Sequence, residues 1–270
     1  MWKYICLALF FAPAILPAQD LKDINYSSNT DEYSQKMCRL DVYNAADAGA
    51  AKPIFVWFHG GGITGGDKKG MPTNIAAPKN GFVLISANYR LSPSIKAWLA
   101  IDDCAEAVAW AFKNAEKIGG DKTKIFIGGH SAGAYLSGMV AFAPKYLQKH
   151  EIKNTDLAGI ILLSGQTTKH FRVRKDSGDT ANSLIPVIDE LAILGNVQNK
   201  ISPLCIIVGD RRLEWKCRVE ENFLLEAAVR ELKNSPYTEI FELQGTNHGT
   251  VASALAPIAT AFIKKISKAR

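Results

Sequence analysis

Apolar runs alternate with longer helical patterns along most of the chain. The apolar runs stand at 53–58, 81–86, 124–127, 157–163, 203–208 and 237–243. Helical patterns stand at 98–118, 132–142, 220–233 and 251–266. Continuous apolar runs, without regular polar alternation, are typical of strands that are covered on both faces. The pattern therefore predicts an α/β fold with a doubly wound, mostly parallel sheet and helices on both of its faces.

The chain has the size and composition of one large globular domain, with 270 residues of which 47% are hydrophobic and 21% charged. We find no internal repeat and no linker rich in Pro, Gly or Ser. The alternation is interrupted over 166–200, where polar stretches precede a helix-like segment at 185–194. An insertion at that point would overhang the carboxyl ends of the strands, where such folds bind ligands. We predict a single domain over 19–270 with a small cap-like insertion at about 166–200.

The first 18 residues differ from the rest. Lys3 precedes an apolar stretch from Tyr4 to Leu16, and the small residue Ala18 comes just before the polar Gln19. This arrangement is typical of a signal peptide cleaved after Ala18, and it predicts a secreted or periplasmic protein. No other segment approaches the roughly 18 apolar residues that cross a bilayer, so no integral membrane span is expected.

Four cysteines follow the predicted signal peptide: Cys38, Cys104, Cys205 and Cys217. An oxidising compartment permits disulfides without requiring them, and Cys205 with Cys217 is the pair to test first. No cysteine has the spacing of a zinc site, so no metal is expected. The net charge of +6 is scattered along the chain apart from two short basic segments, which gives no support for a nucleic-acid partner.

The strongest chemical signal is Gly129-His130-Ser131-Ala132-Gly133, between the predicted strand at 124–127 and the predicted helix at 132–142. A G-x-S-x-G motif needs this strand, turn and helix, because small residues beside the serine let the chain turn sharply and project its hydroxyl above the sheet. A simple turn without chemistry is the alternative. The context favours Ser131 as a nucleophile.

A second signal, His59-Gly60-Gly61-Gly62, follows the predicted strand at 53–58. Acyl transfer develops negative charge on an oxygen, and backbone N–H groups already directed at that oxygen stabilise it best. Glycines leave such groups accessible. A phosphate cradle is excluded because the Lys-Ser or Lys-Thr of a P-loop is missing. Gly61 and Gly62, together with the N–H of Ala132, are therefore the predicted oxyanion hole.

A serine hydroxyl becomes a strong nucleophile only when a neutral imidazole accepts its proton. Among the five histidines, His248 alone follows the last predicted strand and precedes the C-terminal helix. His59 and His130 belong to the motifs above, and His150 and His170 stand in polar segments. His248 is thus the predicted general base.

With these motifs and Asn88-Tyr89-Arg90-Leu91, the sequence resembles the carboxylesterase and hormone-sensitive-lipase-like branch of the α/β-hydrolases, and is similar to secreted bacterial esterases of that kind. The matching order runs from about Leu40 to the C-terminus. The resemblance implies an α/β-hydrolase fold, a Ser, acid and His triad acting through an acyl-enzyme, and no cofactor. It also implies that residues 88–91 brace the oxyanion loop.

The acid departs from the pattern of this family. There it usually stands three residues after the glycine that ends the preceding strand, which here is Gly209, and this position holds Arg212. An arginine cannot orient an imidazole or stabilise its protonated form. Asp210 fits a regular, tight turn, and Glu214 fits a turn that has gained two residues. We favour Glu214 because the residues after it resume the pattern of the relatives, and Asp210 stays open.

The sequence therefore predicts hydrolysis of carboxylic esters. Predicted export, together with polar and aromatic residues in the cap, favours short acyl groups on carbohydrate or other extracellular small molecules. A lipase would need a large apolar lid, and the sequence shows none. An amidase or peptidase using the same triad is one alternative. A non-catalytic binding protein that keeps the fold is another, favoured only by the irregular acid turn.

Overall fold

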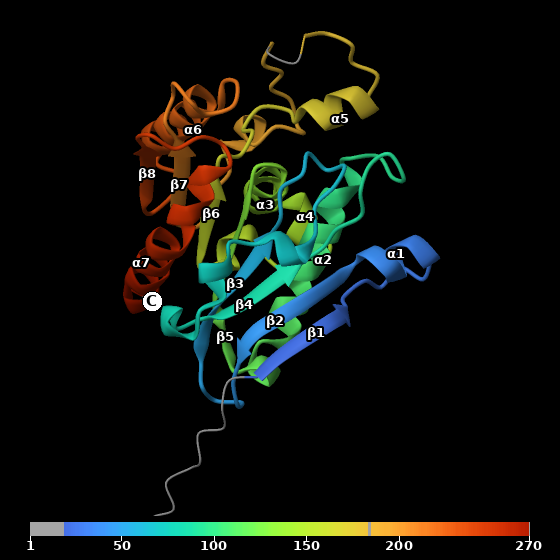
Figure 1. Cartoon of the computed structure of the whole chain (residues 1–270), viewed down its shortest axis with the longest axis vertical. Helices are drawn as coiled ribbons and strands as arrows, with labels where there is room; N and C mark the ends of the chain where they lie inside the picture. Colours follow the sequence, from blue (N-terminus) through green and yellow to red (C-terminus); the bar gives the residue numbers. More distant parts are fainter. Residues whose placement is uncertain (1–18, 183–184, 270) are drawn as a thin grey trace, which may run out of the picture.

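The computed structural model describes residues 19–182 and 185–269, and over these residues one eight-stranded sheet has the order β1-β2-β4-β3-β5-β6-β7-β8 (Figure 1). The strands are β1(Gln19–Asn25), β2(Arg39–Ala45), β3(Lys52–Phe58), β4(Val83–Ala87), β5(Gly120–His130), β6(Gly159–Leu163), β7(Leu204–Gly209) and β8(Thr238–Leu243). β1, β2 and β4 pair antiparallel, and β4, β3, β5, β6, β7 and β8 run parallel. The predicted mostly parallel sheet is confirmed, with strand ends shifted by up to four residues.

The α-helices are α1(Glu32–Met37), α2(Leu99–Asn114), α3(Ala132–Phe142), α4(Lys145–Gln148), α5(Phe171–Asp176), α6(Arg218–Leu232) and α7(Leu255–Ala269). Short 3-10 helices are η1(Lys68–Gly70), η2(Thr73–Ala76), η3(Pro78–Asn80), η4(Glu116–Ile118), η5(Asn154–Asp156), η6(Leu194–Asn196) and η7(Thr250–Ala254). The four predicted helical patterns correspond to α2 with η4, α3, α6, and η7 with α7.

Alternate side chains of each central strand enter two different cores. In β3, Ile54 and Val56 pack into the core that includes α2, α3 and α6, whereas Phe55 and Trp57 pack into the core that includes α7. All four side chains are at most 1% exposed. Burying one such side chain stabilises a fold by roughly 1.5–3 kcal/mol. Burial on both faces is the physical reason for the continuous apolar runs in the sequence.

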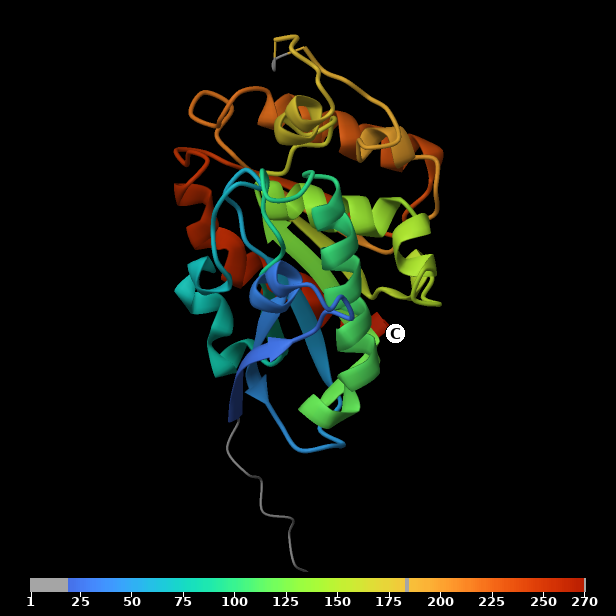
Figure 2. The same ribbon diagram turned by 90° about the vertical axis from the view of Figure 1, so that its right-hand side faces the viewer.

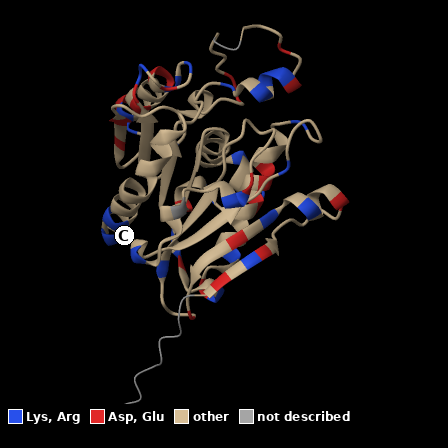
Figure 3. Ribbon diagram, viewed as in Figure 1, with Lys and Arg blue, Asp and Glu red and all other residues tan. Residues whose placement is uncertain are grey.

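The two strands at one edge of the sheet were not predicted. β1 reads Gln-Asp-Leu-Lys-Asp-Ile-Asn and has mostly exposed or half-buried positions, so it lacks the apolar signal of a covered strand. Its pairing with β2 also contains two irregularities of register. Figure 3 shows charges of both signs on these edge strands, in contrast to the central strands.

Residues 166–182 and 185–200 lie above the carboxyl ends of the central strands, and the first of these stretches carries α5 (Figures 1 and 2). The helix predicted at 185–194 is wrong, because residues 186–188 have no regular secondary structure and residues 189–193 form bends and a turn that lead into η6. Pro186 disfavours a helical conformation at Ile185 and offers no N–H group. The Asp189 carboxylate then accepts a hydrogen bond from the Leu191 amide, which closes a local turn.

The cysteines of the described residues are free. Cys205 is buried in β7 and Cys217 is exposed before α6, so the pair that the sequence selected for testing is not bonded. The predicted signal peptide, residues 1–18, lies outside the described residues. Within 19–182 and 185–269, no helix has both the length and the apolar character needed to cross a membrane.

Candidate active site

Ser131 occupies the sharp turn between β5 and α3. Its backbone angles, φ 54° and ψ −115°, are strained for a residue other than glycine. The Ser131 amide donates to the Leu163 carbonyl at 2.9 Å, and its carbonyl accepts from the Tyr135 amide at 3.0 Å. These bonds to β6 and α3 hold the strained turn in place.

Two glycines make this turn possible by letting backbone segments approach each other. A Cβ atom on Gly133 would lie 2.1 Å from the carbonyl oxygen of Phe58, at the end of β3. A Cβ atom on Gly129 would lie 2.3 Å from the carbonyl carbon of Gly133. Both distances are far below van der Waals contact, so the small residues of the motif have the steric role that the sequence predicted.

His248 lies between Ser131 and Glu214. It follows β8, and its Nε2 is 2.9 Å from Ser131 Oγ, while its Nδ1 is 2.6 Å from Glu214 Oε1. The Glu214 side chain is 0% exposed and that of His248 is 25% exposed. One continuous hydrogen-bonded chain thus connects a buried carboxylate, an imidazole and a hydroxyl. Of the two residues Glu214 and His248, only the imidazole is exposed to solvent.

Glu214 is held by donors on both carboxylate oxygens. Oε2 accepts from Ser164 Oγ at 2.7 Å and from the Gly209 amide at 3.1 Å, and Oε1 also accepts from the Trp215 amide at 2.7 Å. Burial raises the pKa of Glu214, but the hydrogen bonds from His248, Ser164 and Trp215 outweigh burial and lower this pKa to about 2. The ionised carboxylate accepts a hydrogen bond from the Nδ1–H group of His248. This bond fixes the tautomer in which the Nε2 lone pair is directed toward Ser131.

Asp210 is bonded elsewhere. Its Oδ2 accepts hydrogen bonds from Arg212 Nη2 at 2.8 Å and from the Gly245 amide at 2.9 Å. These bonds lower the pKa of Asp210, and the bond from Arg212 has the largest effect. The Leu213 and Glu214 amides both donate to the Asp210 carbonyl, so the chain makes a full turn after β7. The turn directs Glu214 inward, and the Arg212 side chain is 75% exposed. The structure therefore brings Glu214 to His248, and Asp210 to Arg212.

The glycine-rich loop after β3 lies beside Ser131. A Cβ atom on Gly60 would be 3.3 Å from Ser131 Cβ. Gly61 and Gly62 have φ values of 109° and 63°, which favour glycine. Ala132 is the first residue of α3, so its N–H group is at a helix N-terminus. The backbone of Gly61, Gly62 and Ala132 thus belongs to the two segments that meet at the serine.

Tyr89 braces this loop, as the resemblance implied. Its hydroxyl donates to the His59 carbonyl at 2.8 Å, and its ring stacks on the His59 ring with centroids 4.4 Å apart. Both residues are buried. The loop is therefore anchored at the residue immediately before its three glycines.

His130 supports the loop that carries His248. Its Nε2 is 2.9 Å from the His248 carbonyl oxygen, and the two ring centroids are 4.9 Å apart. Burial and the neighbouring His248 lower the pKa of His130 to about 4, so it is neutral near pH 7 and can donate this bond. The sequence placed His130 beside the nucleophile without assigning it this contact.

Aromatic side chains that the sequence did not single out border the hydrogen-bonded chain. The Trp215 ring centroid is 5.6 Å from that of His248, and Phe171 of α5 meets Trp215 edge to face at 5.6 Å. A Cβ atom on Gly62 would lie 3.3 Å from the Phe171 ring. An open cleft is lined by Leu213, Glu214, Trp215, Lys216, Asn247 and His248. Its position gives a substrate access to His248 between the turn that follows β7 and the turn that follows β8.

Within the described residues, no group of three or more His, Cys, Asp or Glu side chains is arranged to hold a metal ion.

Comparison with known proteins places this chain in a family. The family model described as BD-FAE matches residues 40–175, just over half of the chain. Phenmedipham hydrolase from Pseudarthrobacter oxydans is 37% identical over 122 residues, which are 42% of this chain and 24% of that protein. Tuliposide B-converting enzyme 1 from Tulipa gesneriana is 34% identical over 110 residues, 35% of this chain and 25% of that enzyme. The chain thus spans about a quarter of the length of these curated relatives.

Solved structures share the fold over nearly the whole chain. A truncated carbohydrate esterase from gut microbiota has a TM-score of 0.73 at 18% identity, covering 93% of this chain and 97% of its own. Esterase 2 of Thermogutta terrifontis, phosphonylated by cyclosarin, has a TM-score of 0.69 at 19% identity, covering 94% and 95%. These likenesses and the sheet order confirm the predicted α/β-hydrolase fold.

Proposed function

We propose that this chain, which belongs to the BD-FAE family, is a serine esterase that cleaves carboxylic esters. The observation that carries the proposal is the continuous contact from Ser131 Oγ through His248 to Glu214, with distances of 2.9 and 2.6 Å. Such a chain activates a hydroxyl that is otherwise a weak nucleophile. The relatives named above as hydrolases and esterases support the same chemistry.

The proposed mechanism has two symmetrical halves. His248 Nε2 accepts the proton of Ser131 as Oγ attacks the ester carbonyl, and the N–H groups of Gly61, Gly62 and Ala132 receive the oxyanion. The intermediate collapses as His248 returns the proton to the departing alcohol, which leaves an acyl-serine. Water then attacks with His248 again as base, and the acid is released with Ser131 restored. Glu214 stabilises the imidazolium in both halves.

We propose short acyl groups on carbohydrate or another extracellular small molecule as the substrate. The fold neighbour described as a carbohydrate esterase supports this class. The aromatic walls formed by Trp215 and Phe171 also support it, because aromatic faces bind the apolar faces of sugar rings as well as short acyl chains. The predicted signal peptide at residues 1–18 supports export, and we propose secretion or a periplasmic location on that ground.

The test compares 4-nitrophenyl acetate, butyrate and octanoate with acetyl 4-nitroanilide, using the wild type and Ser131→Ala. We expect the acetate and butyrate to be hydrolysed fastest, the anilide far more slowly, and Ser131→Ala to lose at least a thousandfold in kcat. Faster cleavage of the anilide would favour the amidase alternative. A folded wild type that cleaves neither class would favour a non-catalytic binding protein.

A further inference from the structure

The glycine-rich loop packs directly against the segment that follows it. A Cβ atom on Gly66 would lie 2.4 Å from the Gly60 carbonyl oxygen, and a Cβ atom on Gly61 would lie 2.3 Å from that of Gly65. The Gly65 amide also donates to the Gly61 carbonyl at 3.1 Å. Because the two backbones are in contact, the position of the second segment determines the position of Gly60 and Gly61.

Lys68 begins η1, directly after this segment, and is 5% exposed, whereas its neighbour Lys69 is exposed. Lysines are almost never buried unless a partner compensates their charge. Buried side chains bind all three polar groups of Lys68. Its Nζ is 2.8 Å from Asp41 Oδ1, its amide donates to Asn88 Oδ1 at 2.5 Å, and its carbonyl accepts from Ser86 Oγ at 2.7 Å. Lys68 is therefore held at its side chain and at both ends of its backbone.

The three partners of Lys68 come from two neighbouring strands of the sheet. Asp41 of β2 and Ser86 of β4 are paired in register, and Asn88 comes directly after β4. Their exposed fractions are 2%, 0% and 8%. Residues two apart along a strand point to the same face, so Ser86 and Asn88 approach Lys68 from one side. The sheet thus fixes Lys68, and through it the segment behind the glycine-rich loop.

The charges around Lys68 favour its ionised form. Besides Asp41, Asp23 Oδ1 lies 3.4 Å from its Nζ, and Asp67 precedes it in the chain. Burial lowers the pKa of Lys68, but the hydrogen bond and charge of Asp41 outweigh burial and raise it. Burial raises the pKa of Asp41, but the bonds from Lys68 and the Asp23 amide, with a smaller effect of Lys22, lower it. Lys68 and Asp41 therefore form a charged pair near pH 7.

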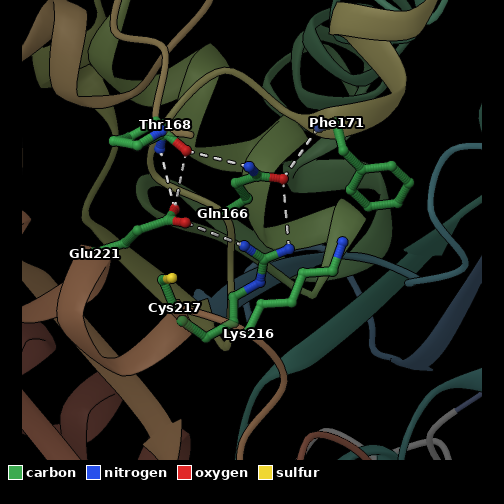
Figure 4. Close-up of a pocket in the computed structure, with 8 residues that line it drawn as sticks. Gln166, Thr168, Phe171, Lys216, Cys217 and Glu221 are labelled. Carbon is green, nitrogen blue, oxygen red and sulfur yellow. Dashed lines mark hydrogen bonds and ion pairs between the residues drawn. The ribbon is translucent and has the colours of Figure 1, made fainter. Parts of the chain in front are cut away.

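The loop has two further supports, which do not depend on this pair. Phe171 of the cap lies against Gly62, and its amide donates to Gln166 Oε1 at 3.1 Å (Figure 4). Tyr89 is bonded to the carbonyl of the residue before the glycines. Since these contacts hold both ends of the loop, we expect loss of the Lys68 pair to displace the glycines between them without unfolding the loop.

We propose that Lys68 is a positioning residue for the oxyanion hole, and that its ion pair with Asp41 holds the N–H groups of Gly61 and Gly62 in place. The inference rests on the proposed esterase function. Oxyanion donors act by being directed in advance at the charge that develops during attack, and such geometry must be held within about 0.5 Å. Loss of the pair should therefore weaken binding of the transition state and spare binding of the substrate.

A transition-state analogue tests this position directly. The carbonyl carbon of 1,1,1-trifluoro-4-phenylbutan-2-one bonds to Ser131 Oγ, whose proton passes to His248, and the ketone oxygen becomes an oxyanion. The unfluorinated ketone, 4-phenylbutan-2-one, binds without forming this adduct. Inhibition constants of both ketones are measured against 4-nitrophenyl acetate with the wild type, Lys68→Met and Lys69→Met. The last variant is the matched control, because it removes the same charge from the exposed neighbour.

We expect Lys68→Met to raise the inhibition constant of the trifluoromethyl ketone about thirtyfold and to lower kcat by a similar factor, less than the loss of a whole oxyanion donor. KM and the inhibition constant of the unfluorinated ketone should stay within about twofold, and Lys69→Met should change none of these values. A purely structural role would reduce the amount of active enzyme and leave the inhibition constant of the trifluoromethyl ketone unchanged. That result would overturn the inference.

A double variant tests the pair even where Lys68→Met unfolds. Removing one partner leaves the other charge buried and unpaired, whereas Lys68→Met combined with Asp41→Asn removes both charges. We expect this protein to be folded by circular dichroism and to keep the raised inhibition constant. A wild-type inhibition constant in the folded double variant would overturn the positioning role and leave the esterase proposal intact. A wild type that binds both ketones equally tightly would refute the esterase proposal itself.

Discussion

Replacing Glu214 with glutamine removes a negative charge from beside His248 at nearly constant size. Opposite charges about 2.6 Å to 4 Å apart attract by roughly 4–6 kcal/mol at an effective dielectric constant near 20, and the observed Nδ1 to Oε1 distance is 2.6 Å. About 1.4 kcal/mol changes a rate tenfold. Since the proposed mechanism makes the imidazolium only during reaction, we expect Glu214→Gln to lower kcat roughly 10³- to 10⁴-fold.

The donors around Glu214 add to this loss. A glutamine amide group placed at Oε1 would face the Trp215 N–H, and placed at Oε2 it would face the Gly209 N–H. Either orientation opposes two donors, so the side chain cannot reproduce both sets of bonds. In the first orientation His248 also loses its preferred tautomer, and Nε2 can no longer accept the proton of Ser131.

Steady-state hydrolysis of 4-nitrophenyl acetate at pH 7.5 measures the effect, and Asp210→Asn is the matched control. Asp210 contacts Arg212 and the Gly245 amide, so we expect its amide variant to keep kcat within about threefold. Circular dichroism would establish that both variants are folded. A larger loss for Asp210→Asn than for Glu214→Gln would refute the assignment of Glu214 as the residue that orients His248.

Two further predictions concern stability. Gly133→Ala should lower the free energy of unfolding, measured by urea titration, by more than about 2 kcal/mol, because its Cβ would lie 2.1 Å from the Phe58 carbonyl oxygen. Gly65 has open space around it, so the control variant Gly65→Ala should change the free energy of unfolding by less than about 1 kcal/mol. Equal urea midpoints would contradict this steric reasoning. The His130 pKa of about 4 lies below the unfolded value near 6.5, so unfolded chains bind more protons between these values and stability falls as pH falls from 6.5 to 4. His130→Asn should flatten that decline in the urea midpoint, and parallel curves for variant and wild type would show that His130 is not the cause.

The central sheet could be predicted because its strands are buried on both faces. β3 and β6 are continuous apolar runs for that reason. The helices between the strands could be predicted because their apolar residues recur at helical spacing. β1 escaped prediction because an edge strand with mostly exposed positions has a polar sequence. The helix predicted over 185–194 failed at Pro186, where local backbone restriction outweighs apolar spacing.

The parts of the candidate site that short motifs determine could be predicted from the sequence. The parts whose position depends on the length of a turn could be predicted less well. Ser131 and the glycine loop follow from steric needs within a few residues. The choice between Asp210 and Glu214 depends on how many residues the turn after β7 contains, and two carboxylates four positions apart fit different turns equally well. Trp215 and Phe171 are brought together by the packing of the cap on the start of α6, which leaves no regular spacing in the sequence.

Covalent labelling tests the central claim, that the turn at Ser131 presents an activated hydroxyl to His248. Wild type, Ser131→Ala and His248→Ala are incubated with a fluorophosphonate, and tryptic peptides are analysed by mass spectrometry. The account predicts one stoichiometric adduct on Ser131, in the peptide spanning 125–145, that is lost in Ser131→Ala and forms at least a hundredfold more slowly in His248→Ala. An unlabelled wild type, or equal labelling of all three proteins, would contradict it.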